Sequence, residues 1–286
     1  MRNPRFGVLV TTFNDPTILS KNLKTLYDQH YDELNIVCVD DDSDIPASET
    51  MAFDFDRDRL EFIRIPHSER AVARGIGIKR LMELEVDYFI FLDSDMHVNK
   101  GFFGKINKFI HELDPDGIIF PEQAYSKSEN LMTKVKVFER NLYQAHYDNY
   151  TPTSIEAARM WKTSSFRGFI DGLNAFEEIQ PTIRAYKENQ RIKKIQGAFI
   201  YHDEGYVTMD NLLKKKKYYF NSASSHEEVK LGEMISRFYF FRKQLYNMEN
   251  LKKYLKHPIL SFGVMYMYLR LSLIGVSSII HNRKGR

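Results

Sequence analysis

Acidic and small polar side chains follow three short apolar runs in the first hundred residues of the chain. Thr11 and Thr12 end the first run, the sequence DDDSD fills residues 40–44 after the second, and DSD fills residues 93–95 after a later one. Crowded carboxylates repel one another unless positive charge lies between them, and a hard divalent cation with oxygen ligands supplies that charge. A single Asp in such a place would more often cap a turn. Two clusters favour a site for Mg²⁺ or Mn²⁺, which binds one or two carboxylates and completes its shell with water and substrate phosphates.

These side chains must be held by strands and helices. The sequence predicts both, because short apolar runs alternate with amphipathic stretches. This pattern is typical of a mostly parallel sheet with crossover helices, an α/β fold. The carboxyl ends of parallel strands meet at one edge, where such sheets bind their ligands. Strands are expected at residues 6–12, 34–40, 60–65, 88–92 and 117–121.

Two helices are expected between these strands. Asp15 and Pro16 predict the start of the first, with the Asp15 carboxylate capping free amides and Pro16 in the first turn. The second is expected at about residues 69–84, where Gly75 and Gly77 lower the helix propensity and indicate a close approach of the backbone.

Composition narrows the class of protein. The chain has 286 residues, with 43% hydrophobic and 28% charged residues, which excludes disordered, collagen-like and low-complexity classes. Cys38 is the single cysteine, so an intramolecular disulfide and a cysteine-rich zinc site are excluded, and a cytoplasmic location is expected. The apolar run near the N-terminus is too short for a secretory signal.

The last quarter of the chain differs from the rest in charge and pattern. Residues 211–286 carry a net charge of +11 and residues 1–210 a net charge of −8. Lysines and aromatic residues at helical spacing predict a C-terminal helical extension, with a boundary near Gly205 that gives parts 1–205 and 206–286. The interleaved apolar residues favour an anionic membrane surface as the partner of this extension, and no nucleic acid partner is expected.

Residues 258–280 are long enough to span a bilayer, but Arg270 lies in the middle of the segment. A charge at the bilayer centre costs about 2.5–3.5 kcal/mol on insertion scales. An interfacial helix or helical hairpin is therefore favoured over a membrane span or a helix buried in a soluble core, with the protein peripheral on the inner face of the cell membrane.

The order of four motifs resembles that of inverting family 2 glycosyltransferases with the GT-A fold, a Rossmann-like, mostly parallel sheet flanked by helices. These motifs are VLVTTFND, IVCVDDDSD, ERAVARGIGIKRL and FIFLDSDMHV. The resemblance covers about residues 5–125 and extends weakly to about residue 205. It implies an enzyme that moves a sugar from a nucleotide diphosphate sugar to an acceptor with inversion.

The resemblance assigns donor-binding roles to residues of these motifs. Thr11 and one of Asp40 or Asp41 would hold the base and ribose, and Arg74 would face the diphosphate or shape its pocket. In the DxD-like segment, Asp93 and Ser94 would contact the donor, and Asp95 would bind the metal together with Asp93. Two positions depart from the family pattern. Asp42 replaces the usual Gly, which puts the loop conformation in question, and Gly75 replaces the usual Asn.

A later segment, GFIDGLNAFEEIQPTIRAY, resembles the region that carries the acidic pair with the general base of the family. Glu177 and Glu178 fall on the pair, Glu178 standing where the family normally has Asp, and Asp171 is the reserve candidate. His202 falls where the family often has a histidine near the metal or diphosphate. An acidic helix N-terminus and a loop histidine are the ordinary alternatives for these residues.

The predicted function is a metal-dependent hexosyltransferase of the cytoplasmic membrane face, acting on a glycan or a polyprenyl-phosphate-linked acceptor. A UDP-sugar is favoured as donor, and a GDP-sugar is the alternative. Two other readings stay open: a membrane-recruited nucleotide-binding protein without catalysis, and a sugar-phosphate nucleotidylyltransferase. The second would need a glycine-rich phosphate loop after the first strand, and TTFNDP is not glycine-rich. The sequence does not predict the oligomeric state.

Overall fold

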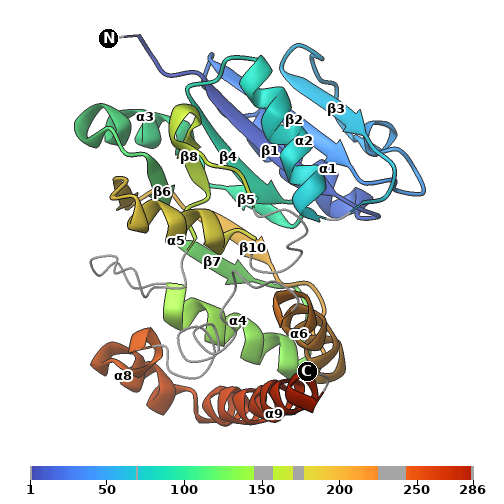
Figure 1. Cartoon of the computed structure of the whole chain (residues 1–286), viewed down its shortest axis with the longest axis vertical. Coiled ribbons are helices and arrows are strands. Elements are labelled where there is room, and N and C mark those ends of the chain that lie inside the picture. The colour runs from blue at the N-terminus through green and yellow to red at the C-terminus, as the bar shows by residue number, and fades with distance from the viewer. Residues whose placement is uncertain (1, 69, 145–156, 170–176, 225–242, 285–286) are drawn as a thin grey trace. The chain divides into compact units, whose positions relative to one another are not determined.

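Seven strands form the main sheet of the computed structural model, in the order β3-β2-β1-β4-β8-β6-β9 (Figure 1). The strands β1 (Phe6–Thr12), β2 (Leu34–Asp40), β3 (Leu60–Arg64) and β4 (Tyr88–Asp93) run parallel to one another. Antiparallel β8 (Met160–Lys162) separates them from β6 (Gly117–Ile119) and β9 (Ile192–Lys194), which run parallel to each other. The predicted α/β class and the first four predicted strands are confirmed, and the fifth is shorter than expected.

The structure describes all residues except 1, 69, 145–156, 170–176, 225–242 and 285–286. The chain divides into two compact units, each described by itself below. Unit 1 comprises Met1–Pro121, Glu156–Gly172 and Glu177–His202, and unit 2 comprises Glu122–Ile155, Leu173–Phe176 and Asp203–Arg286. The predicted division of the chain at residue 205 stays a prediction.

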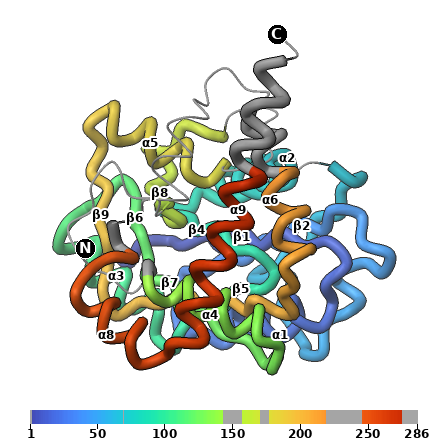
Figure 2. Tube along the Cα trace, turned by 90° about the horizontal axis from the view of Figure 1, so that it is seen from below, coloured from blue at the N-terminus to red at the C-terminus, as the bar shows by residue number. Residues whose placement is uncertain are grey.

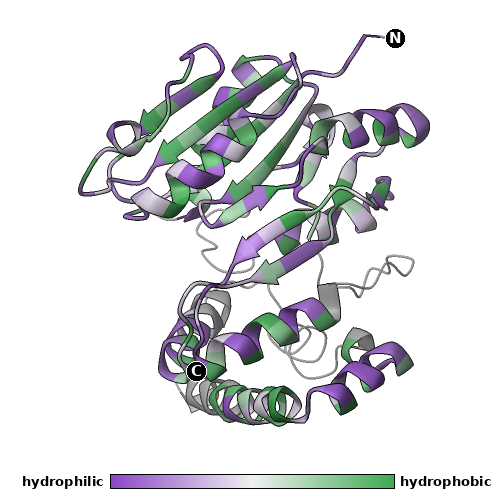
Figure 3. Cartoon of the chain, turned by 180° about the vertical axis from the view of Figure 1, so that it is seen from behind, coloured by the Kyte–Doolittle hydropathy of each residue, from purple (hydrophilic) through white to green (hydrophobic). Residues whose placement is uncertain are grey.

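Unit 1 holds the seven-stranded sheet and the helices that cover it. These are α1 (Pro16–Tyr27), 3-10 helices η1 (Ala47–Thr50) and η2 (Thr163–Ser165), α2 (Arg70–Glu83), α3 (Phe102–Leu113) and α5 (Ile179–Lys187). Strand β5 (Met96–Val98) pairs antiparallel with β10 (Ile200–Asp203). Figure 3 shows the central strands as largely hydrophobic. Alternate residues of β1, including Phe6, Val8 and Val10, share one buried cluster with residues of α1 and α3.

The other face of β1 and β2 packs against α2, and Gly77 is the point of closest approach. A Cβ atom on Gly77 would lie 2.2 Å from Cδ1 of Leu9 and 3.0 Å from Cγ2 of Val39, and both side chains are fully buried. A Cβ on Gly75 would meet nothing within 4 Å. The close backbone approach expected from the two glycines is confirmed at Gly77, whereas Gly75 faces open space.

We expect Gly77→Ala to lower the free energy of unfolding by about 1–3 kcal/mol, because an added methyl overpacks a buried contact. The matched variant Gly75→Ala should raise it by about 0.5–1 kcal/mol, since Ala is the better helix former and has room there. Urea unfolding of the two variants measures both changes. Equal effects of the two substitutions would contradict the packing described for α2.

Unit 2 contains β7 (Glu122–Tyr125), α4 (Leu131–Gln144), α6 (Met209–Ser224), 3-10 helix η3 (Lys243–Tyr246), α8 (Met248–Lys256) and α9 (Pro258–Lys284). Figure 2 shows α9 beside α4 and α6. Helix α4 was not expected from the sequence, in which residues 125–165 have no regular pattern. Polar residues such as Thr133 and Glu139 lie on its buried face and hide the helical apolar pattern. Among the residues described, none of the helices combines the length and the hydropathy needed to cross a membrane.

Candidate active site

Three loops that carry predicted site residues start from one edge of the unit 1 sheet. The register pairs Thr12 with Asp40 across β1 and β2, and Thr11 with Asp93 across β1 and β4. The carboxyl ends of β1, β2 and β4 are therefore neighbours, and the two acidic loops flank the end of β1.

The loop after β2 is held by the Asp40 carboxylate. Asp40 is buried, and its Oδ1 accepts a hydrogen bond from the Ser43 amide at 2.9 Å, while its Oδ2 accepts one from the Ala47 amide at 2.9 Å. Asp42 has φ of 66°, in the left-handed region that Gly adopts easily and that Asp tolerates better than most residues. Arg64 donates to Asp42 Oδ1 at 3.0 Å and to the Ser43 carbonyl at 2.8 Å. The loop thus has a left-handed residue where the family pattern has Gly.

Asp41 lies beside an exposed aromatic pair that the sequence argument missed. Its Oδ1 accepts hydrogen bonds from the Ser68 amide at 2.7 Å and the Ser68 hydroxyl at 3.0 Å, and its Oδ2 lies 3.1 Å from His67 Nδ1. The His67 ring is 4.7 Å from the ring of Phe13, which is 49% exposed. An aromatic residue directly after the first strand was the available sequence signal.

Arg74 of α2 joins three carboxylates from distant parts of the chain. The guanidinium donates to Asp93 Oδ1 at 2.6 Å, to Glu177 Oε1 at 2.9 Å and to Glu178 Oε1 at 2.9 Å. Arg74 is fully buried, and its guanidinium carbon lies 5.2 Å from the centre of the Phe91 ring. These three hydrogen bonds all go to carboxylates, so the structure places Arg74 inside the acidic cluster rather than on a solvated helix face.

Arg159, which the sequence argument also missed, contacts the same cluster. Its Nη2 lies 3.3 Å from Glu178 Oε2, and Arg70 Nη1 lies 4.0 Å from Glu177 Oε1. Glu178 precedes α5 as its N-cap residue, but its side chain makes no capping hydrogen bond. The carboxylate is instead held by Arg74 and Arg159. Asp171, the reserve candidate for the base, lies outside the described residues.

The pKa values of the three carboxylates are shifted in different directions because their neighbours differ. Burial by itself raises the pKa of Asp93, but Arg74, Arg70 and Arg159 outweigh it and lower the pKa below its ordinary value. Burial also raises the pKa of Glu178, yet Arg159 and Arg74 bring it below the ordinary value. For Glu177, burial together with the charge of Glu178 outweighs Arg74, so its pKa is raised. Glu178 is 20% exposed and Glu177 only 3%, so Glu178, whose pKa is lowered, is also the more accessible member of the pair.

Asp95 and His202 lie together after β4 and on β10. Nε2 of His202 is 3.3 Å from Asp95 Oδ2, and the buried Oδ1 of Asp95 has no hydrogen-bond partner among the described residues. Ser94 donates from its hydroxyl to Asp15 Oδ2 at 3.2 Å. The expected capping of α1 by the Asp15 carboxylate is wrong, since the side chain makes no such bond, although Pro16 begins the helix as predicted.

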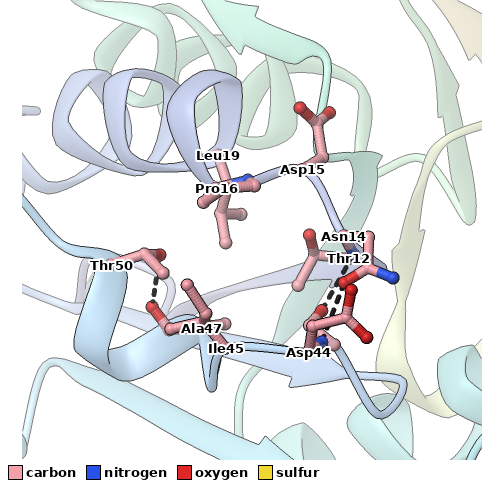
Figure 4. Close-up of a pocket in the computed structure, with 10 residues that line it drawn as sticks. Thr12, Asn14, Asp15, Pro16, Leu19, Asp44, Ile45, Ala47 and Thr50 are labelled. Carbon is pink, nitrogen blue, oxygen red and sulfur yellow. Dashed lines mark hydrogen bonds between the residues drawn. The ribbon is translucent and has the colours of Figure 1, made fainter.

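A cavity of about 250 Å³ lies between the start of α1 and the loop after β2. Figure 4 shows Pro16 and Leu19 on one side and Ile45 and Ala47 on the other. Asn14 links the two loops at one end of the cavity. Its backbone amide donates a hydrogen bond to Ser43 Oγ at 2.9 Å, and its side-chain Oδ1 accepts one from the Asp44 backbone amide at 2.8 Å. The acidic cluster around Arg74 does not line this cavity.

In the part of the chain that the structure describes, no three His, Cys, Asp or Glu side chains cluster closely enough to hold a metal ion by themselves. Asp95 and His202 offer two donors. Mg²⁺ and Mn²⁺ sites often take only one or two protein ligands and receive the rest from water and phosphates. The Asp95–His202 pair fits such a site.

Solved structures with the same fold include S. aureus TarS, at a TM-score of 0.55 and 16% identity over 88% of this chain and 47% of that one. This chain thus spans about half of that TarS chain. The TarS fragment 1–349 in complex with UDP-GlcNAc matches with a TM-score of 0.56 and 14% identity, over 99% of this chain and 92% of the fragment. Mannosyltransferase PcManGT from Pyrobaculum calidifontis, in complex with GDP-Man and Mn²⁺, matches with a TM-score of 0.56 and 12% identity. That match covers 99% of this chain and 80% of the mannosyltransferase chain.

A comparison with curated protein sequences finds no match. Residues 7–170 do match the protein family described as "Glycosyl transferase family 2". The matched segment is more than half of the chain and contains the strand-end loops after β1, β2 and β4. The protein therefore belongs to glycosyl transferase family 2 and is a glycosyltransferase with the GT-A fold.

Proposed function

We propose that this protein transfers a hexose from a nucleotide diphosphate sugar to an acceptor hydroxyl, with inversion and with Mg²⁺ or Mn²⁺. The observation that carries the proposal is Glu178, an ionised and partly exposed carboxylate held by two arginines beside the DxD-like segment. A UDP-sugar is the favoured donor and a GDP-sugar the alternative. The UDP and UDP-GlcNAc complexes of TarS and the GDP-Man complex of PcManGT support this choice.

The donor is proposed to bind along the edge formed by β1, β2 and β4. Asp41 is the favoured carboxylate for the base or ribose, because its side chain is 12% exposed, whereas that of Asp40 is 2% exposed and holds the loop with both oxygens. The exposed Phe13–His67 pair beside Asp41 offers ring faces for a nucleobase. Thr11, Asp93 and Ser94 complete the proposed donor contacts at the strand ends. Arg74 is proposed to act by fixing Asp93, which belongs to the same edge.

The metal is proposed to bind at Asp95 with His202, next to Asp93. The buried Oδ1 of Asp95 has no hydrogen-bond partner within the described structure, so an oxygen is available for a cation. Such a cation, when bound, would neutralise charge on the departing diphosphate. Imidazole nitrogen together with carboxylate oxygen suits Mn²⁺ better than Mg²⁺, which prefers oxygen ligands.

Glu178 is proposed as the general base. An inverting transfer is a single displacement at the anomeric carbon, so the base takes the proton of the acceptor hydroxyl on the face opposite the leaving group. Arg159 and Arg74 keep Glu178 ionised and hold it in one orientation. Glu177 is proposed to position Arg74 rather than to meet the acceptor, because its side chain is only 3% exposed.

The acceptor is proposed to be a glycan or a polyprenyl-phosphate-linked glycan, presented at the cytoplasmic face of the cell membrane. In this proposal, residues 1–205 carry donor chemistry and residues 206–286 form a membrane-associated extension. The net charge of +11 in residues 211–286 supports this assignment, since cations are attracted to anionic lipids.

A thermal-shift assay with UDP, UDP-GlcNAc and GDP-Man, each with and without Mn²⁺, tests the donor and the metal together. A ligand that binds only the native state raises the melting temperature. We expect a nucleotide sugar to raise it, and Mn²⁺ to enlarge that shift. Asp95→Ala should abolish the Mn²⁺-dependent part of the shift while leaving the melting temperature of the free protein within a few degrees of wild type.

The control for this prediction is Asp32→Ala, which removes an exposed carboxylate before the amino end of β2, at the opposite edge of the sheet. It should leave the Mn²⁺ effect intact. An unchanged Mn²⁺ effect in Asp95→Ala would exclude Asp95 as a ligand. Nucleotide binding without transfer to any acceptor, from any donor tested, would instead favour a nucleotide-binding protein without catalysis.

A further inference from the structure

Helix α9 is apolar on two sides, and the described residues of its own unit cover only one of them. Val264, Met267 and Leu271 are buried, and the last two share a cluster with Leu212 of α6. A Cβ on Gly263 would lie 2.3 Å from Val135 of α4, so the two helices are in close contact. This inner side accounts for the packing of α9 in unit 2.

The outer side of α9 continues a row of exposed hydrophobic residues that begins on α8. On α8 the row has spacings of three and four residues, and the same spacings recur on α9, which places each set on one helix face. Only His257 stands between the two helices. We call this row the outer stripe; its side chains are 47–75% exposed, and its members are Met248, Leu251, Leu255, Ile259, Phe262, Tyr266, Leu269 and Leu273.

A row of eight exposed large hydrophobic residues is unusual on a soluble surface and marks a site of interaction. A helix that is hydrophobic all round is normally buried on every side. The outer stripe would therefore be stabilised by a partner that covers its apolar surface, and this partner must accept apolar side chains along two consecutive helices.

Cationic side chains accompany the outer stripe. Lys252 and Lys256 are exposed and follow Leu251 and Leu255 directly in α8. Arg270, the charge that argued against a membrane span, donates to the Tyr266 hydroxyl at 2.7 Å. Its guanidinium carbon lies 5.7 Å from the centre of the same ring. An arginine paired with an amphipathic tyrosine is suited to a boundary between apolar and polar surroundings.

We propose that the outer stripe lies on an anionic lipid bilayer, with its apolar side chains among the acyl chains and the cations at the headgroups. A second copy of the chain is the main competing partner. A symmetric dimer would bring the same lysines of both copies to one interface, where like charges repel, whereas anionic lipid attracts them. This inference deepens the proposed membrane location and names the surface that would produce it.

Vesicle sedimentation tests the proposal on the full chain. We expect binding to vesicles of phosphatidylcholine with phosphatidylserine, and weaker binding without phosphatidylserine. Phe262→Gln/Leu269→Gln should lower the partition coefficient about tenfold or more, since each lost apolar anchor removes buried hydrophobic area. The matched control Leu113→Gln/Leu131→Gln also replaces two exposed hydrophobic residues, in this case two leucines that are 43% and 56% exposed and lie outside the stripe. It should bind like wild type.

Lys252→Gln/Lys256→Gln separates charge from hydrophobicity. At low salt it should weaken binding to phosphatidylserine vesicles about fivefold per lysine and leave binding to neutral vesicles nearly unchanged. Unchanged vesicle binding by the Phe262/Leu269 variant would overturn the proposal. A second result would also overturn it: light scattering shows that the wild-type protein is a dimer and the variant a monomer, and neither protein binds vesicles.

The donor assay keeps this result apart from the proposed transfer activity. The Phe262/Leu269 variant should retain the wild-type thermal shift with nucleotide sugar and Mn²⁺, because its changes lie in unit 2. Loss of vesicle binding with an intact donor shift supports the stripe. If the wild-type protein binds vesicles but no nucleotide sugar, the proposed donor binding is refuted, and the proposal that the outer stripe binds a bilayer remains supported.

Discussion

Glu178→Gln is expected to lower the rate of sugar transfer by about 10²–10⁴-fold, the usual contribution of a positioned general base. The amide has nearly the shape of the carboxylate but cannot accept the proton of the acceptor hydroxyl. Glu178 is suited to that role because Arg159 and Arg74 hold its carboxylate in place, because its lowered pKa leaves it unprotonated at neutral pH, and because part of its side chain reaches the surface. The rate is measured as transfer from a nucleotide sugar at saturating donor, at a temperature well below unfolding.

Two further variants separate catalysis from structure. Glu178→Asp keeps a carboxylate, one methylene shorter, of the type that the resemblance to the family implies at this position, and should recover part of the lost rate. Glu177→Gln changes a side chain that is 3% exposed, so it should affect stability more than the rate at saturating donor. Glu178→Gln must also keep its thermal shift with donor and Mn²⁺. Full activity of Glu178→Gln would move the base to Glu177 or Asp171.

The parallel half of the sheet was predictable because its strands are buried on both faces. Residues of β1, β2 and β4 are buried at nearly every position and most of them are apolar, which makes each strand a distinct run in the sequence. The short strands β7 and β8 were not predictable in this way, since each is only four or three residues long. Their place depends on pairing with distant segments rather than on local pattern.

The acidic loops after the strands could be located from the sequence, but the way their charge is balanced could not. Crowded carboxylates need a positive partner, and the sequence alone indicated a divalent cation for that role. In the structure, Arg74 supplies positive charge to Asp93, Glu177 and Glu178. Arg74 lies 103 residues from Glu177 in the chain, and no local spacing relates them. The role of Arg159 could not be predicted for the same reason, since it lies in a stretch without helical or strand periodicity that would relate it to the acidic cluster.

The second large effect is therefore expected at Arg74. Arg74→Met keeps much of the side-chain volume but removes the charge from the centre of three carboxylates, of which Glu177 is 3% exposed, Glu178 20% and Asp93 24%. Breaking a buried ion pair by removal of one partner costs about 3–5 kcal/mol, because the remaining charges stay desolvated. We expect a decrease of that size in the free energy of unfolding, measured by urea titration at neutral pH.

Arg80→Met is the matched control, since it makes the same substitution on the same helix. Arg80 pairs with Glu61 at 2.9 Å, but its side chain is 36% exposed, and exposed pairs contribute about 0–1 kcal/mol. The double variant Arg74→Met/Glu177→Gln should be less destabilised than the sum of its single changes, because Gln removes one of the uncompensated charges. Additive effects, or a loss at Arg74 no larger than at Arg80, would show that Arg74 does not serve to balance the acidic cluster. The proposed positioning of Asp93 and Glu178 by Arg74 would then fail with it.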